Sequence, residues 1–280
     1  MHPTKTRSLA QRLRDRIGRT FDHRVVRWMG LGDTQQVWYL RQLFALLDID
    51  LVIDVGGNLG QYAGLLRDRV RYRGALITVE PIPAMAQALR RRFANDPKWA
   101  LAACALGEQP GRAILNVMQG HELSSLLQPS NTASDKLDRQ NQVQQQVEVE
   151  VSTLGQLLRE HPLAQDARNV YLKLDVQGYE LPVLRGAQDG LSRIVALQAE
   201  ASVIPLYAGV PSYHELMRDI EEMGFQLSFI PAHNYTQVPD MIDFDCHFVS
   251  RRSLISKGYL RAQATEAAVD SADIARPRST

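Results

Sequence analysis

Short apolar runs that alternate with helical patterns constrain the fold of this chain more than any other feature of its sequence. Most of these runs are as long as one strand and lead into a segment with helical spacing, which is the pattern of βαβ units around a parallel sheet. The last two runs have no helical segment between them, so the final strand should be antiparallel. We therefore predict a doubly wound α/β fold with a seven-stranded, mostly parallel sheet. The predicted strands are 51–55, 75–80, 99–106, 170–176, 194–201, 225–230 and 244–250.

The strand pattern also predicts how the chain is organised. With 280 residues, the chain is near the size at which a single hydrophobic core stops growing. We expect an N-terminal helical extension at 1–47, one α/β domain at 48–256 and a flexible tail at 257–280. The pattern breaks at about 108–152, where a polar stretch separates two short strand-like runs. Excursions of this length inside a compact domain are usually functional or disordered, so we expect a substrate lid there.

Charge is distributed unevenly along the chain. The whole sequence is nearly neutral, with 32 basic and 31 acidic residues, whereas residues 1–27 carry eight Lys or Arg against two Asp. A neutral molecule lacks the field that gathers nucleic acid, so we expect a small substrate and no nucleic-acid partner. The basic arm fits either an amphipathic helix packed on the main domain or a surface helix that meets anionic lipid or an acidic partner. The oligomeric state stays open.

Apolar segments and cysteines indicate the compartment. No stretch has the length of a transmembrane segment or the pattern of a secretory signal. Cys104 and Cys246 lie in strand-like runs, without the spacing of a disulfide framework or a zinc site, and are predicted core residues. We therefore expect a cytoplasmic protein.

The first predicted strand leads directly into the glycine-rich turn Asp54-Val55-Gly56-Gly57-Asn58-Leu59-Gly60. Glycines here let the chain turn sharply and let a ligand approach the backbone, while the following helix offers free N–H groups. Tight packing between a strand and a helix needs glycine as well. The turn alone therefore does not decide between a binding site and a packing requirement.

Two acids at strand ends indicate which ligand would fit the turn. Asp54 comes directly before the glycines, where a carboxylate would repel the phosphates of a dinucleotide but would suit an ammonium group. Glu80 ends the second strand, where it could accept hydrogen bonds from both hydroxyls of a ribose. A ligand with a ribose, an ammonium and no phosphate is S-adenosylmethionine. The alternative is that both acids only cap the helices that follow them.

The fourth long strand supplies a second group of polar residues. Lys173 and Asp175 lie on the same strand face, and a doubly wound sheet places this strand beside the first one. Asp54 and Asp175 should therefore flank one crevice. A lysine inside a central strand needs a partner, and Asp175, Glu180 and Glu200 are within reach. Such a pair could also be purely structural.

Taken in order, five motifs resemble the FkbM-type methyltransferase family. The motifs are DVGGNLGQY (54–62), EP (80–81), ALG (105–107), SSL (124–126) and LKLDVQGYE (172–180). The resemblance covers about 51–250 and implies a Rossmann-like class I methyltransferase fold with S-adenosylmethionine as methyl donor. It also implies O-methylation of a secondary metabolite, sugar or glycolipid, and hence a small-molecule or lipid-linked hydroxyl acceptor.

The resemblance implies roles for individual residues as well. Asp175 would lie where cofactor and substrate meet. Two positions depart from the family pattern, since Gln177 stands where Glu is frequent and Gly155 replaces a usual Asp. The residues expected at the cofactor are Asp54, Gly56, Gly57, Asn58, Gly60, Tyr62, Glu80, Pro81 and Ser125.

Methyl transfer to a hydroxyl needs an in-line approach of the acceptor and a group that takes its proton. The candidates for this base are His121 and Asp175, and Lys173 and Glu200 complete the predicted catalytic group. In an alternative mechanism, Asp175 and Glu200 hold Mg²⁺, which lowers the pKa of the acceptor hydroxyl, although no third ligand is evident. Two rival functions are an inactive cofactor-binding or interaction protein of the same fold and a nicotinamide-dependent oxidoreductase.

Overall fold

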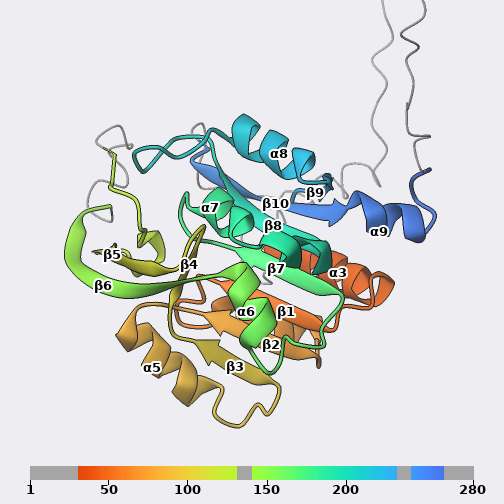
Figure 1. The fold of residues 1–280 in the computed structure, drawn as a ribbon, viewed down its shortest axis with the longest axis horizontal. Coiled ribbons are helices and arrows are strands. Elements are labelled where there is room, and N and C mark those ends of the chain that lie inside the picture. The colour runs from red at the N-terminus through yellow and green to blue at the C-terminus, as the bar shows by residue number, and fades with distance from the viewer. Residues whose placement is uncertain (1–30, 131–140, 232–240, 262–280) are drawn as a thin grey trace, which may run out of the picture.

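The computed structural model describes residues 31–130, 141–231 and 241–261, and its main feature is a seven-stranded sheet (Figure 1). The strand order is β3-β2-β1-β7-β8-β10-β9. β10 runs antiparallel to both of its neighbours, and the other strand pairs are parallel. The predicted fold class is confirmed. The strands are β1 (Leu51–Val55), β2 (Ala75–Val79), β3 (Trp99–Ala102), β7 (Val170–Leu174), β8 (Ile194–Ser202), β9 (Phe225–Phe229) and β10 (Asp243–Ser250).

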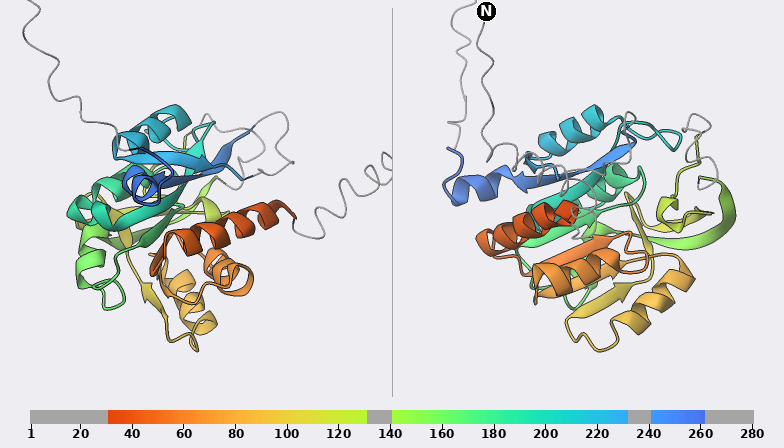
Figure 2. Two further views of the ribbon diagram at one scale, coloured as in Figure 1. Left: turned by 90° about the vertical axis from the view of Figure 1, so that its right-hand side faces the viewer. Right: turned by 180° about the vertical axis from the view of Figure 1, so that it is seen from behind.

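Helices cover both faces of this sheet, which forms the middle of three layers (Figure 2). One face carries α6 (Leu154–Glu160), α7 (Glu180–Arg185) and α8 (Tyr213–Glu222), with η3 (Gln188–Arg193). The other face carries α3 (Leu31–Leu46), α4 (Gln61–Leu65), its π-helical continuation η1 (Leu66–Val70), and α5 (Pro83–Arg92). Because side chains alternate along a strand, Ile53 packs into the first core and Val52 into the second. The short helix α9 (Arg251–Ser256) follows β10.

The helical spacing before the first strand is confirmed for α3. Val37, Leu40 and Phe44 recur at intervals of three and four residues and are buried against the back of the sheet. The basic arm at 1–27 and the tail from 262 lie outside the described residues. Within the described part of the chain, no helix is both long and apolar enough to cross a membrane.

The predicted strand at 99–106 is wrong in one respect, because it is two strands in two different sheets. β3 ends at Ala102, and β4 (Ala105–Gly107) joins β5 (Gly111–Met118) and β6 (Val143–Thr153) in a small sheet of order β4-β6-β5. Both ends of the run are apolar and packed, so the composition of the run does not indicate that the chain passes from one sheet to another. Residues 131–140 of the expected lid lie outside the described residues, and the lid stays a prediction.

The two cysteines differ in their surroundings. Cys246 is fully buried on β10, as expected of a core residue. Cys104 is only partly buried, because it lies at the point where the chain leaves β3 for the small sheet.

A substitution at Phe248 tests the placement of β10 between β8 and β9. Its side chain is fully buried. Replacement by Ala should lower the free energy of unfolding by about 3 to 5 kcal/mol, because it removes apolar contacts and leaves a cavity. Chemical denaturation measures this loss. The control is Ile114→Ala on β5, where the side chain is 48% exposed and the loss should stay below about 1 kcal/mol. Equal losses in the two variants would contradict the assignment of Phe248 to the core.

Candidate active site

A cavity of about 740 Å³ lies where β1, β2, β7 and β8 end. This volume is typical of small-molecule sites, and doubly wound sheets bind their ligands at this edge. The segment 121–126 of the insertion, which includes η2 (His121–Leu123), forms a further wall. Residues far apart in the sequence therefore face one cavity.

The turn after β1 lines the cavity, and its glycines also meet a packing requirement. Gly56 has a φ of 80°, and a Cβ atom there would lie 1.9 Å from the carbonyl oxygen of Asp175. A Cβ atom at Gly57 would lie 2.0 Å from the Thr78 side chain. Only glycine therefore lets the end of β1 approach both neighbouring strands this closely. The packing requirement is therefore confirmed, and the turn also lines the cavity, while its role in ligand binding stays a prediction.

Glu80 follows β2, is almost fully buried and lines the cavity. Its Oε2 atom accepts a hydrogen bond from the backbone N–H of Asn58 at 2.8 Å, and its Oε1 atom accepts one from Ile82 at 2.8 Å. A carboxylate has about four acceptor positions, so each oxygen keeps room for a hydroxyl donor. Burial raises the pKa of Glu80 to about 7, although both backbone hydrogen bonds oppose this shift.

Lys173 joins the first strand to the fourth. Its Nζ atom lies 3.0 Å from Asp175 Oδ2 and 3.6 Å from Asp54 Oδ1. The expected pairing of this lysine with a carboxylate is confirmed: Asp175 is one of the three candidate partners, and Asp54 is a further partner that was not among them. Burial alone would lower the pKa of Lys173, but the two carboxylates outweigh burial and raise it. The lysine is therefore charged at any physiological pH.

Asp54 lies beneath the cavity and is not one of its lining residues. It is fully buried, and neither of its carboxylate oxygens has a hydrogen-bond partner among the described residues. Burial raises the pKa of Asp54, and the charge of Lys173 opposes this effect. A direct contact between Asp54 and a cationic ligand stays a prediction, because in this structure Lys173 lines the cavity instead.

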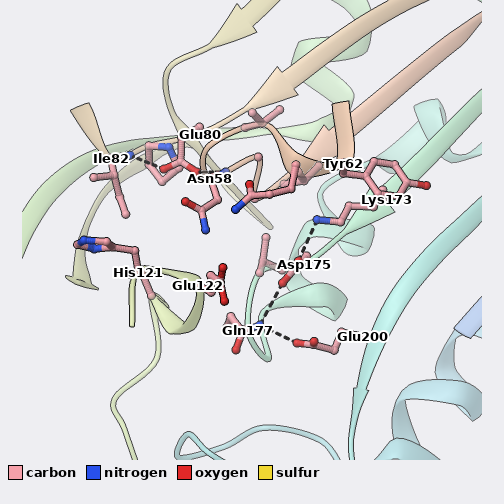
Figure 3. A pocket seen from close by; sticks show the side chains of 18 of the residues that line it. Asn58, Tyr62, Glu80, Ile82, His121, Glu122, Lys173, Asp175, Gln177 and Glu200 are labelled. Atoms are coloured by element: carbon pink, nitrogen blue, oxygen red, sulfur yellow. Dashed lines mark hydrogen bonds and ion pairs between the residues drawn. The ribbon is translucent and has the colours of Figure 1, made fainter. Parts of the chain in front are cut away.

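Gln177 lies between Asp175 and Glu200 (Figure 3). Its Nε2 atom donates hydrogen bonds to Asp175 Oδ1 at 3.0 Å and to Glu200 Oε2 at 2.7 Å. Burial and the neighbouring carboxylates, Asp175 and Asp243 foremost, raise the pKa of Glu200 well above its usual value. The described residues hold no group of three or more His, Cys, Asp or Glu suited to a metal ion, so they give the Mg²⁺ alternative no support.

Two further predicted residues, Tyr62 and Ser125, line the cavity and contact other residues of the site. The ring of Tyr62 lies 5.5 Å from Lys173 Nζ, and its hydroxyl donates to Gln198 Oε1 at 2.9 Å. Ser125 is buried, and its hydroxyl donates to the backbone carbonyl of Gln177 at 2.9 Å. This bond ties the insertion to the turn after β7.

His121 is exposed on η2, and Figure 3 shows it apart from Asp175 and Glu200. The structure therefore brings one of the two candidate bases, Asp175, into the acidic group and leaves the other on a different wall. Among the predicted site residues, Asp54 and Gly60 do not line the cavity. The remainder do: Gly56, Gly57, Asn58, Tyr62, Glu80, Pro81, His121, Ser125, Lys173, Asp175 and Glu200.

Four acids in the cavity wall were not predicted from the sequence: Asp68, Glu122, Asp243 and Asp245. The positions of Asp243 and Asp245 could have been predicted from the strand pattern. β10 is antiparallel to β8, so its first residues lie at the end of β8, and Asp245 pairs in register with Glu200. Alternation then places Asp243 on the same face. Nothing in the polar sequence around Glu122 distinguishes that residue from its neighbours.

Comparison with known proteins identifies the family. The family model described as the methyltransferase FkbM domain matches residues 54–227, from the end of β1 to β9. This chain belongs to the FkbM methyltransferase domain family. The resemblance read from the sequence motifs is thereby confirmed, and membership of a methyltransferase family disfavours the oxidoreductase alternative.

Other similarities of this FkbM-family chain are more remote. It is 28% identical over 156 residues to Methyltransferase 1 of Beauveria bassiana (strain ARSEF 2860), a match that covers 51% of the chain and 60% of that protein. A putative O-methyltransferase from Klebsiella pneumoniae has a TM-score of 0.42 at 13% identity, with 77% of this chain and 80% of that chain covered. Magnesium protoporphyrin IX methyltransferase from Synechocystis PCC 6803, with bound SAM, has a TM-score of 0.41 at 10% identity, with 89% and 100% covered. Both structural similarities are too remote to bear on function.

Lys173→Met should lower the free energy of unfolding at pH 7 by about 3 to 5 kcal/mol, because it leaves the buried Asp54 carboxylate without a counter-charge. The pKa of Asp54 is already raised by burial and would rise further in this variant. The deficit should therefore shrink as the pH falls from 7 towards 5 and Asp54 takes up a proton. Chemical denaturation at both pH values measures it.

The matched control for Lys173 is Lys257, which makes a 3.0 Å ion pair with the largely exposed Asp48. Lys257→Met should cost less than about 1 kcal/mol at either pH. A deficit of Lys173→Met that does not change with pH would show that Asp54 is not the source of the destabilisation.

Proposed function

We propose that this chain is an S-adenosylmethionine-dependent methyltransferase that methylates a hydroxyl oxygen of a small-molecule, sugar or lipid-linked acceptor. One observation carries the proposal. A single cavity has the glycine turn and Glu80 on one side and the acid pair Asp175 and Glu200 on the other. A cofactor and an acceptor would therefore meet inside it.

The residues on the turn side fit S-adenosylmethionine. Glu80 would accept hydrogen bonds from the ribose hydroxyls with the acceptor positions that its backbone contacts leave free. Asn58 Oδ1 is buried without a hydrogen-bond partner among the described residues and would accept an N–H group. The Tyr62 ring and the nearby carboxylates suit a cationic ligand. When bound, the cofactor supplies a methyl group on a positively charged sulfur.

The residues on the other side fit a hydroxyl acceptor. Lys173 holds Oδ2 of Asp175, and Gln177 holds Oδ1, so the carboxylate is fixed while its side chain remains 40% exposed. An anchored and accessible carboxylate can orient a hydroxyl group and take its proton. Glu200, whose Oε2 atom accepts a hydrogen bond from Gln177, would form a further hydrogen bond with the acceptor. His121 stays the alternative base.

The rival within the same fold is a protein that binds the cofactor but performs no chemistry. Binding would be identical in the two cases, so only turnover separates them. The basic arm at 1–27 could dock such a protein to a membrane surface or an acidic partner, but the arm lies outside the described residues.

Cofactor binding should depend on pH through Glu80. S-Adenosylhomocysteine should bind and NAD⁺ should not. Because burial raises the pKa of Glu80 to about 7 and its ionised form is the better acceptor, the affinity should fall as the pH drops through 7. Between pH 8 and pH 6 the Kd from calorimetry should rise by up to about tenfold.

Glu80→Gln should abolish this pH dependence and weaken binding at pH 8 by about 1 to 3 kcal/mol. The control is Glu148→Gln on the exposed side of β6, which should bind as the unmodified chain does. Binding of NAD⁺ but not of S-adenosylhomocysteine would refute the proposed function.

Asp175→Asn should reduce methyl transfer by about 10²- to 10⁴-fold, because the acceptor loses its base or orienting group. The Kd of S-adenosylhomocysteine should change much less. The assay uses labelled methyl donor with a panel of sugars, glycosides, phenols and lipid-linked hydroxyl compounds. Asp189→Asn, at an exposed position on η3, is the control. A stable Asp175→Asn variant with near-normal turnover would place the chemistry on another residue, whereas a lower melting temperature alone would indicate a structural partner of Lys173.

A further inference from the structure

Gln177 contacts four separate parts of the site. Its Nε2 atom donates to Asp175 at 3.0 Å and to Glu200 at 2.7 Å. Its Oε1 atom lies 3.1 Å from the hydroxyl of Tyr207, and its backbone carbonyl accepts a hydrogen bond from Ser125 at 2.9 Å. The side chain thus links the ends of β7 and β8, as Figure 3 shows, and contacts the loop after β8, while the backbone carbonyl contacts the insertion.

The backbone at this position is held in an uncommon conformation. Gln177 has a φ of 54°, in the left-handed region that glycine favours, and its exposed fraction is only 8%. Such a conformation costs about 1 kcal/mol or more in a residue with a side chain. It persists where the surroundings fix it, and here the hydrogen bonds of the side chain and of the backbone carbonyl supply that constraint.

The amide also relieves an electrostatic conflict. Two carboxylates that face each other repel, and proteins usually separate them with a shared proton or a cation. An amide nitrogen has two N–H donors and can satisfy one oxygen on each side. The charged groups around the pair come from three strands and two helical segments: Asp54, Glu122, Lys173, Glu180, Asp243 and Asp245.

We propose that Gln177 is a positioning residue that takes the place of a cation between Asp175 and Glu200 and holds both carboxylates at the acceptor side of the cavity. The assignment rests on the proposed methyl transfer. The amide is linked in turn to the insertion, because the single hydroxyl proton of Tyr207 is shared between Gln177 Oε1 and the carbonyl of Leu123. The wall formed by 121–126 and the acid pair are therefore held in one arrangement.

The first experiment measures Mn²⁺ binding by calorimetry and electron paramagnetic resonance. Gln177→Glu keeps the shape of the side chain and supplies a third carboxylate where the amide stood, so it should bind Mn²⁺ about tenfold or more tightly than the unmodified chain. Adding Asp175→Asn should remove the gain. The matched control is Gln165→Glu, which adds the same charge at an exposed position and should bind as the unmodified chain does.

The second experiment records the carboxyl ¹³C resonances of Asp175 and Glu200 in protein labelled at Asp and Glu. Gln177→Met preserves length but removes both N–H donors, so both resonances should move. Gln165→Glu should move neither. A side chain that only fills space would be replaced by Met without a change at either carboxylate, which separates a positioning role from a structural one.

Unmoved resonances in Gln177→Met would overturn the proposal. So would a Gln177→Glu variant that gains no Mn²⁺ site, or an unmodified chain that binds Mn²⁺ equally tightly through Asp175. None of these measurements uses cofactor or acceptor. A failure of S-adenosylhomocysteine to bind would therefore refute the proposed function separately, whereas normal binding together with unmoved resonances would overturn only the role of Gln177.

Discussion

The rest of this site depends on the ion pairs that the buried ammonium group of Lys173 makes with Asp54 and Asp175. Lys173 and Asp54 are register partners on the adjacent strands β7 and β1, and Asp175 follows two residues later on the same face as Lys173. One nitrogen therefore reaches both carboxylates. Without it, Asp54 would be an uncompensated charge in the centre of the sheet, which a protein rarely tolerates. The pairing of the two central strands and the floor of the cavity are thus stabilised by the same three groups.

Asp175 connects this buried cluster to the turn above it. Its backbone N–H donates to the carbonyl of Val55 at 3.1 Å, which continues the β1–β7 pairing beyond the end of β7. Its own carbonyl occupies the space that a side chain at Gly56 would need. The glycine turn and the acidic group are therefore two sides of one packing arrangement. A substitution at Gly56 would move the Asp175 carboxylate as well as the turn that lines the cavity beside Glu80.

The regular part of this arrangement could be predicted from the sequence, and the irregular part could not. Periodicity predicted the strands, and the doubly wound order brought Asp54 and Asp175 to neighbouring strand ends, where Lys173 contacts both. The burial of Asp54 beneath the cavity depends on packing that alternation along one strand does not reveal. The bridge made by Gln177 depends on a positive φ at a residue other than glycine, which has no sequence signature. The second sheet that begins at β4 was hidden because both halves of its apolar run are packed.

The two sides of the cavity are built by different chemistry, with a consequence for specificity. On the turn side, the backbone N–H groups of Asn58 and Ile82 orient Glu80, and their positions follow from the main-chain path. On the side proposed for the acceptor, the side chains of Lys173 and Gln177 orient the carboxylates of Asp175 and Glu200. Side-chain donors are changed by single substitutions, whereas main-chain donors are changed only when the fold changes. Under the proposed function, the acceptor could therefore change through substitutions at residues such as Gln177 while the turn side keeps its geometry.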